Sequence, residues 1–322
     1  MADEKKFNTN LSIWTNTVTD LVTRDFNECG VDFDEYSKQC AMNAMTNIYQ
    51  LITASNVNIQ NIDNSNLREI VGQCASLKLN ANAVPSECYF QLRKKKIGNQ
   101  YVQTVEMGIE GDGNDAILRN FGENVEAVYP VWIVKKGDKF TYPKHVGIAI
   151  TPPEWEQMGE SEMTEKVVYP VKLTDGTVQY LISERQGVKI NLFAHVRNNL
   201  MNETFGICES RYKADEKQLE QIKVEKEKIF VALRQCETVE EMLECEVARP
   251  YISAAWLDTP ESMIVRKMRN NAIKKFKKNY NTMAQRSFLQ IDETYQQAQE
   301  EIEENANQQD FEEVVVQQSG EF

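Results

Sequence analysis

Residues 88–122, CYFQLRKKKIGNQYVQTVEMGIEGDGNDAILRNFG, carry the pattern that decides the fold. Apolar residues alternate with polar ones from Cys88 to Leu92, which is the period of a strand with one buried face. A turn near Gly98-Asn99 returns the chain as a second strand. The glycine-rich run that follows leads into a short helix. We therefore predict a β-hairpin followed directly by a helix.

Helices are predicted on both sides of this hairpin, because apolar residues recur there at helical spacing. Asn66 is expected to cap a helix that runs to about residue 79. Residues 215–235 form a charged helix, and Thr238 begins the next one with a capping box. Thr259 followed by Pro260 marks the start of a late helix.

Further strands follow the hairpin. Pro130 marks a bulge or an unpaired edge within the first of them, and Asp175-Gly176 is a strong signal for a second hairpin. The predicted strands span 125–135, 139–150, 167–173 and 177–182.

The expected fold class is therefore α+β. N-terminal helices precede a twisted, mainly antiparallel sheet with packed helices, and a C-terminal helical region and a disordered acidic tail follow. The expected domains are an N-terminal helical region (1–64), a core (65–286) that holds a charged helical insertion (215–248), and the tail (287–322).

Composition excludes several classes of protein. The chain has 322 residues, of which 41% are hydrophobic and 26% charged, as in ordinary globular proteins. The longest apolar run, 127–134, is too short to cross a bilayer, so we expect a cytoplasmic protein with no membrane partner. Seven cysteines without a CxxC pair and only two histidines argue against a zinc site or a histidine triad. We expect no catalytic residue, no metal and no cofactor.

Charge is distributed unevenly along the chain. The net charge is −13, but residues 287–322 hold ten acids and no lysine or arginine, so the first 286 residues carry only −3. Just before the tail, residues 262–286 hold eight basic residues and no acid. The negative overall charge therefore does not exclude a polyanionic partner, because the field at a site is local.

The basic block at 262–286 is expected to form one continuous amphipathic helix. Its apolar residues fall within an arc of about 100°, and basic residues fill most of the remainder. Solvated helix faces normally mix both signs, so the block favours polyanion binding; simple solvation is the alternative. Arg269 lies inside the apolar arc, where a charge must reach water, pair or line a cleft. The polyanion contacts predicted here are Arg266, Lys267, Arg269, Lys274 and Lys277.

The hairpin supplies a second basic surface. Tyr89, Gln91, Arg93 and Lys95 share one face of the first strand. Such a face suits single-stranded nucleic acid, because cations meet phosphates and bases stack on the ring at about 1–3 kcal/mol each. The alternative is a charged tip that blunts an edge strand. The contacts predicted here are Tyr89, Arg93, Lys94, Lys95 and Lys96.

Three further residues are candidates for DNA contact. Lys135 belongs to a lysine cluster around Gly137-Asp138, for which a plain turn is the alternative. Arg119 lies in the predicted helix after the hairpin. Trp256 is a candidate platform for a base or sugar, and a core position is its alternative.

The order of these elements resembles the RecT family of phage single-strand annealing proteins, over roughly residues 65–280. Family members place a basic residue in the glycine turn, where this chain has Glu110, and a lysine in the late helix that falls on Arg266 here. The segments that carry the resemblance are LKLN (77–80), CYFQ (88–91), YVQTV (101–105), GIEGDGNDAILRNFG (108–122), VEAVYPVWIVKKGD (125–138), Trp256, MIVRKMR (263–269) and 272–280.

The resemblance implies a non-enzymatic protein that binds single-stranded DNA and anneals complementary strands without ATP. It further implies a ring or filament of identical chains in the cytoplasm of a bacterial host. The implied partners are single-stranded DNA, the annealed duplex, other copies of the chain, a phage exonuclease and a host single-strand binding protein. The hairpin and the late basic helix are then expected to line one groove for a DNA strand.

Two alternatives stay open from the sequence. One is a binding module that does not anneal DNA, whose basic helix docks an acidic protein partner. The other is a nuclease, which the lack of a convincing cluster of metal ligands in the sequence opposes. The acidic tail either competes with DNA for the basic groove, recruits host factors, or only improves solubility.

Overall fold

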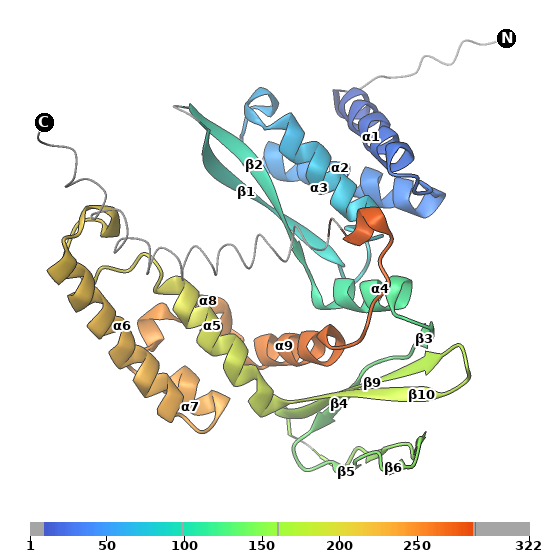
Figure 1. The fold of residues 1–322 in the computed structure, drawn as a ribbon, viewed down its shortest axis with the longest axis vertical. Helices are drawn as coiled ribbons and strands as arrows, with labels where there is room; N and C mark the ends of the chain where they lie inside the picture. The colour runs from blue at the N-terminus through green and yellow to red at the C-terminus, as the bar shows by residue number, and fades with distance from the viewer. Residues whose placement is uncertain (1–9, 98–99, 160, 286, 288–322) are drawn as a thin grey trace, which may run out of the picture. The chain divides into compact units, whose positions relative to one another are not determined.

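A computed structural model describes residues 10–97, 100–159, 161–285 and 287 of the chain (Figure 1). Helices and antiparallel strands make up a mixed α+β fold, as the sequence predicts. The chain divides into two compact units. Unit 1 comprises the described residues up to Val128, Lys172–Thr177 and those from Phe276 onward, and unit 2 comprises Tyr129–Val171 and Val178–Lys275.

Unit 1 is built around a hairpin and the helices that cover it. Its helical elements are α1 (Asn10–Glu28), α2 (Glu35–Ala54), η1 (Ile59–Asn61), α3 (Asn64–Ser76) and α4 (Gly111–Phe121), and its strands are β1 (Cys88–Ile97), β2 (Gln100–Ile109) and β3 (Val125–Val128). The predicted turn at residues 98–99 lies outside the described residues, but β1 and β2 pair antiparallel along their whole length.

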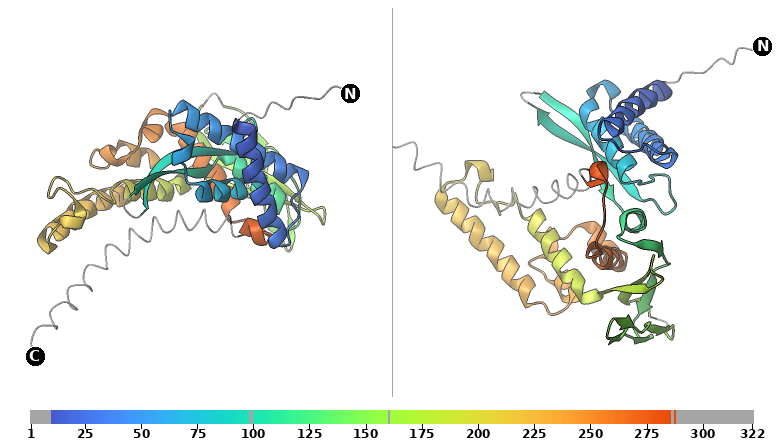
Figure 2. Two further views of the ribbon diagram at one scale, coloured as in Figure 1. Left: turned by 90° about the horizontal axis from the view of Figure 1, so that it is seen from above. Right: turned by 45° about the vertical axis from the view of Figure 1, so that its right-hand side comes forward.

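The core of unit 1 lies on one face of the hairpin. The inward side chains of Cys88 and Val105 are buried together with those of Ile48 and Leu67, from α2 and α3. The right-hand view of Figure 2 shows α1–α3 on one side of the hairpin. The alternation predicted from the sequence is confirmed, because Cys88 is buried and its neighbour Tyr89 is exposed.

The start of α3 differs from the prediction that Asn66 caps it. Asp63 is the cap, and its carboxylate accepts hydrogen bonds from the N–H groups of Ser65 and Asn66. The Asn66 side chain instead bonds the backbone of Val105 twice, accepting from its N–H at 2.7 Å and donating to its carbonyl at 3.1 Å. These two backbone groups of β2 need partners where they are buried, so α3 is fastened to the hairpin.

Unit 2 contains the remaining strands and a cluster of helices. Its strands are β4 (Trp132–Lys135), β5 (Lys139–Thr141), β6 (His145–Val146), β7 (Ala149–Ile150), β8 (Glu154–Glu156), β9 (Thr164–Leu173, whose last two residues belong to unit 1) and β10 (Val178–Glu184), and its helical elements are η2 (Arg185–Val188), α5 (Lys189–Asn199), η3 (Arg211–Lys213), α6 (Glu216–Gln235), α7 (Val239–Glu244), η4 (Arg249–Tyr251), α8 (Ala254–Asp258) and α9 (Pro260–Lys274).

The strands after the hairpin are more broken than the sequence suggests. The predicted strand 125–135 is two strands, β3 and β4, which both pair with β9. Pro130 lies in the interruption, and proline cannot donate a ladder hydrogen bond. The prediction of one strand over 139–150 is wrong, because this segment forms three short strands, β5, β6 and β7. The Asp175-Gly176 hairpin is confirmed between β9 and β10, with Gly176 at a φ of 84°.

The prediction of one continuous helix over 262–286 is wrong. Helix α9 ends at Lys274, and the chain then passes from unit 2 to unit 1. There it pairs with the end of α4: Glu123 N–H donates to the Lys277 carbonyl at 2.9 Å, and Asn279 N–H donates to the Phe121 carbonyl at 2.7 Å. These long-range backbone bonds replace the helical ones that local periodicity predicts.

The capping predictions have mixed outcomes. The capping box predicted for α7 is half formed: the Thr238 side chain accepts from Glu241 N–H, but the Glu241 carboxylate accepts from Glu237 N–H and not from Thr238 N–H. A reciprocal box that was not predicted, between Asp215 and Gln218, opens α6. Pro260 opens α9 as expected. The Thr259 hydroxyl does not cap that helix, however, because it donates to the carbonyl of Ala255 at 3.0 Å.

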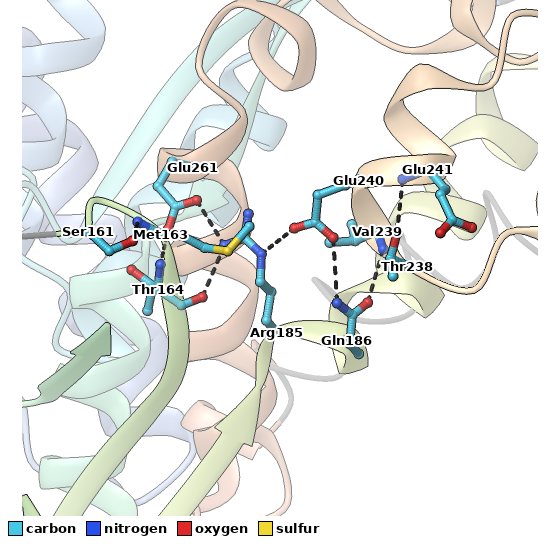
Figure 3. A network of polar contacts seen from close by, with 10 residues as sticks. All are labelled: Ser161, Met163, Thr164, Arg185, Gln186, Thr238, Val239, Glu240, Glu241 and Glu261. Carbon is cyan, nitrogen blue, oxygen red and sulfur yellow. Dashed lines mark hydrogen bonds and ion pairs between the residues drawn. The ribbon is translucent and has the colours of Figure 1, made fainter. Parts of the chain in front are cut away.

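A buried arginine joins three elements of unit 2 (Figure 3). Arg185 is 8% exposed, and its guanidinium pairs with Glu240 of α7 and, at 2.8 Å, with Glu261 in the first turn of α9. The same guanidinium donates to the Thr164 carbonyl, while Glu261 accepts from Thr164 N–H at 2.6 Å. Because Glu240, Glu261 and the Thr164 carbonyl at the start of β9 all bond to this guanidinium, Arg185 fixes the start of α9 against β9.

Two other features bear on the predicted context. None of the helices in the described ranges is both long and apolar enough to cross a membrane. The predicted acidic tail lies outside the described residues except for Ser287, whose buried hydroxyl accepts a hydrogen bond from Ser76 at 2.7 Å.

Replacing Asn66 with alanine should lower the free energy of unfolding by about 1–3 kcal/mol, because two buried backbone groups of Val105 lose their partner. Urea unfolding followed by circular dichroism measures the change. Asn64→Ala is the matched control, since Asn64 is exposed in the same helical turn. Equal stability of the two variants would contradict the role of Asn66.

Replacing Arg185 with glutamine should destabilise the protein by about 3 kcal/mol, because Glu240 and Glu261 would keep charges without their buried partner. The exposed pair Arg234–Glu227 provides the control, and Arg234→Gln should change stability by less than about 1 kcal/mol. Thermal unfolding of both variants distinguishes a structural arginine from a surface one.

Candidate nucleic-acid interface

The outer face of the β1–β2 hairpin is the best-defined candidate surface. The strand register places Tyr89 opposite Gly108, Gln91 opposite Glu106 and Arg93 opposite Thr104. Helices α2 and α3 cover the other face of the hairpin (Figures 1 and 2). Tyr89, Gln91 and Arg93 are exposed, so the hairpin presents an aromatic ring and a cation along one strand.

The Tyr89 ring lies against the backbone of Gly108. A Cβ atom built on Gly108 would lie 2.2 Å from the ring, so the ring lies directly across the glycine backbone. A side chain at position 108 would move the ring from this position. The ring is 38% exposed, which gives the face a supported aromatic surface on which a base can stack.

Arg93 is held on the same face by two polar neighbours. Its Nε donates to a Glu106 carboxylate oxygen at 2.9 Å, and its Nη2 donates to the Gln91 side-chain oxygen at 3.2 Å. The side chains of Arg93 and Glu106 are both more than half exposed. A guanidinium has five N–H donors, so Arg93 keeps donors for a further acceptor such as phosphate.

Three lysines follow Arg93 in β1. Lys94, Lys95 and Lys96 are paired in the hairpin opposite Gln103, Val102 and Tyr101. Their side chains lie outside the described residues.

Arg119 and Lys277 are both placed by the C-terminal end of α4, in unit 1. Arg119 is exposed in the last turn of α4, 3.8 Å from a Glu87 carboxylate oxygen. Lys277 pairs with Glu123 at 2.7 Å, just after α4 ends. The hydrogen bond from Lys277 lowers the pKa of Glu123, whereas burial raises the pKa of Glu87. Each of these two cations therefore already has a carboxylate beside it.

In unit 2 the predicted contacts are less uniform. Lys135 pairs with Glu162 at 3.1 Å, and Lys274 is exposed in the last turn of α9. Arg266 and Lys267 are half-buried. Arg269 turns inward, and its Nε donates to the hydroxyl of the fully buried Tyr169 at 2.8 Å. Arg269 thus satisfies a buried phenol of β9, which explains how a charge fits the apolar side of α9.

Trp256 occupies the core position that was its alternative. It is 1% exposed, and its ring centroid lies 6.1 Å from that of His195. The His195 Nε2 accepts a hydrogen bond from Ser253 N–H at 3.1 Å, at the start of α8. A ring enclosed in this way has no face for a base, so Trp256 does not belong to the candidate surface.

The predicted groove between the hairpin and the late basic helix involves both units. The hairpin belongs to unit 1, whereas α9, with Arg266 and Lys267, belongs to unit 2. Lys277 follows α9 in the sequence but belongs to unit 1. Because the two basic surfaces lie in different units, the shared groove stays a prediction.

Unit 2 also contains a cavity of about 340 Å³ beside Arg185. Its lining combines three basic and three acidic side chains, so its charge selects neither an anion nor a cation, and we assign it no ligand. In the described ranges, no group of three or more histidine, cysteine or carboxylate side chains is placed to hold a metal ion. The cavity is lined by Lys136, Met163, Glu165, Lys166, Glu184, Arg185, Gln186 and Glu240.

The chain matches no protein-family model, no curated protein and no solved structure. The resemblance to the RecT family therefore rests on its sequence segments alone.

Sequence reasoning missed two residues of the hairpin face, Glu106 and Gly108. Both follow from the register. In an antiparallel ladder that pairs Ile97 with Gln100, each step back along β1 is matched by one step forward along β2. A hairpin centred on the predicted turn thus places Gly108 opposite Tyr89 and Glu106 opposite Gln91, diagonally beside Arg93.

The environment of His195 leads to a prediction of how the free energy of unfolding depends on pH. Burial, and then the nearby charge of Lys267, lower the pKa of His195. The folded protein therefore favours the neutral imidazole, so the free energy of unfolding is highest above a pH of about 6.5 and falls as the pH drops below it. Urea unfolding at two pH values on either side of 6.5 measures the fall.

His195→Gln is the control, because glutamine does not titrate. The variant should lose less stability on acidification than the natural chain does. An identical pH dependence in the two proteins would show that His195 is not the responsible group.

Proposed function

We propose that this protein binds single-stranded DNA and anneals complementary strands without ATP. The observation that carries the proposal is the outer face of the hairpin, where the Tyr89 ring lies across Gly108 and Arg93 is exposed on the same strand. The sequence adds three lysines directly after Arg93. The resemblance to the RecT family supports the same function.

The physical requirements of annealing fit such a face. Two DNA backbones repel each other, so phosphate charge must be neutralised while the base edges stay free to pair. A strand face that holds phosphates with cations and stacks a base on a ring binds DNA from one side. This mode of binding needs no hydrolysis of a nucleotide.

The assembly belongs to the proposal as well. We propose a ring or filament of identical chains, because a single hairpin contacts only a few nucleotides. Its other proposed partners are the annealed duplex, a phage exonuclease and a host single-strand binding protein, in the cytoplasm of a bacterium. These partners rest on the resemblance alone.

The main alternative is a module that docks an acidic protein without annealing DNA. An acidic protein would use the cations of the late basic helix, and it has no bases to stack on Tyr89. Loss of binding on removal of the ring alone therefore favours nucleic acid over an acidic polypeptide.

Fluorescence anisotropy with a labelled oligothymidine tests the role of the ring. Tyr89→Leu should weaken binding about tenfold, the effect expected for one stacked base. Tyr212→Leu is the control, since Tyr212 is an exposed tyrosine of unit 2. Equal affinities of the two variants would contradict a stacking role for Tyr89.

The salt dependence of binding tests the lysines. Replacing Lys94, Lys95 and Lys96 with glutamine should reduce the log–log salt slope by about 2, because each phosphate that is no longer neutralised accounts for about 0.7. The same substitutions at the exposed Lys217, Lys223 and Lys228 of α6 remove equal charge elsewhere and should leave the slope unchanged.

Annealing itself is measured with complementary strands that carry a fluorophore and a quencher. The natural protein, without ATP or magnesium, should anneal them faster than they anneal alone, because it neutralises the repulsion between their backbones. An unchanged annealing rate would overturn the proposed function.

A further inference from the structure

Predicted phosphate contacts in this chain repeatedly face a glutamate. The pairs are Arg93–Glu106 at 2.9 Å, Arg119–Glu87 at 3.8 Å, Lys135–Glu162 at 3.1 Å and Lys277–Glu123 at 2.7 Å. A carboxylate and a phosphate offer an arginine the same kind of acceptor, a pair of anionic oxygens. At each pair, a carboxylate therefore lies beside the cation and would compete with a phosphate for it.

Glu106 differs from the other three acids by its position. It lies directly opposite Gln91 in the hairpin, on the face that also carries Tyr89 and Arg93. Its side chain is 54% exposed. Glu87, in contrast, is buried and accepts a hydrogen bond from Asn80 N–H at 2.7 Å, so it has a structural role.

We infer that Glu106 competes with DNA phosphate for Arg93 and thereby limits the affinity of the hairpin face for a strand. This inference rests on the proposed function and concerns the regulation of the same surface. A phosphate that takes the Nε donor of Arg93 must displace the Glu106 carboxylate, and a phosphate on the other donors lies beside that carboxylate and is repelled by it. Both effects weaken binding without altering the fold.

The pair is suited to being broken and remade. Exposed ion pairs contribute little to stability because water screens them. Arg93 can therefore exchange its carboxylate partner for a phosphate at small cost. Modest affinity favours annealing, because a strand must shift along the surface until its complement is in register and the duplex must then leave.

Glu106→Gln tests the inference, because glutamine keeps the size of the side chain and removes its charge. The variant should bind labelled oligothymidine about two- to fivefold more tightly at low salt, the range that one exposed ion pair represents. The log–log salt slope should steepen by about 0.7, as expected for one more neutralised phosphate.

Glu28→Gln is the matched control. Glu28 faces Arg24 at 3.7 Å on α1 and is exposed, so the substitution removes the same charge from another arginine pair of unit 1. Its affinity should match that of the natural chain. Equal tightening by both variants would show that overall charge, and not Glu106, sets the affinity.

A double-mutant cycle identifies Arg93 as the group through which Glu106 acts. In an Arg93→Gln background, Glu106→Gln should raise the affinity less than it does in the natural chain, because only the direct repulsion by the carboxylate remains to be relieved. An undiminished gain in that background would overturn the inference. If the natural chain itself fails to bind DNA, the proposed function fails; if it binds and Glu106→Gln has no effect, only the competition by Glu106 is refuted.

Discussion

The structure of unit 1 depends on one constraint: a two-stranded hairpin is stable only when one face is buried. An isolated pair of strands is marginal in water, and here α2 and α3 cover the face that carries Cys88 and Val105. The same burial leaves the opposite face for polar and aromatic side chains. The candidate surface is thus a consequence of how the hairpin is stabilised, because strand alternation sends every second residue to the uncovered side.

The helices are attached to the hairpin by polar contacts as well as by packing. Asn66 pairs with the backbone of Val105 and so continues the hydrogen bonding of β2 into α3. In unit 2, Arg185 performs a comparable task between β9, α7 and α9. In both units a side chain with several hydrogen-bonding groups fixes the junction between a strand and a helix.

Much of the fold could be predicted from local sequence, and the errors share a physical cause. The hairpin follows from alternation, and the turn at Asp175-Gly176 follows from its residue types. The end of α9 at Lys274 could not be predicted, because residues 277–279 bond to the end of α4, which is remote in the sequence. The role of Asn66 was missed for the same reason, since its partner Val105 is distant along the chain. The sequence predicted which residue types the candidate site contains. The pairing of Arg93 with Glu106 could be recognised only from the register of the two strands.

The contact between Tyr89 and Gly108 has an evolutionary consequence. A side chain at position 108 would collide with the ring in its present position, so a change at one position affects the other. A relative with a larger residue at 108 would have to turn the aromatic at 89 away from this backbone or replace it, and one without the aromatic would be free to abandon the glycine. These two positions should therefore change together across related chains, as a linked pair.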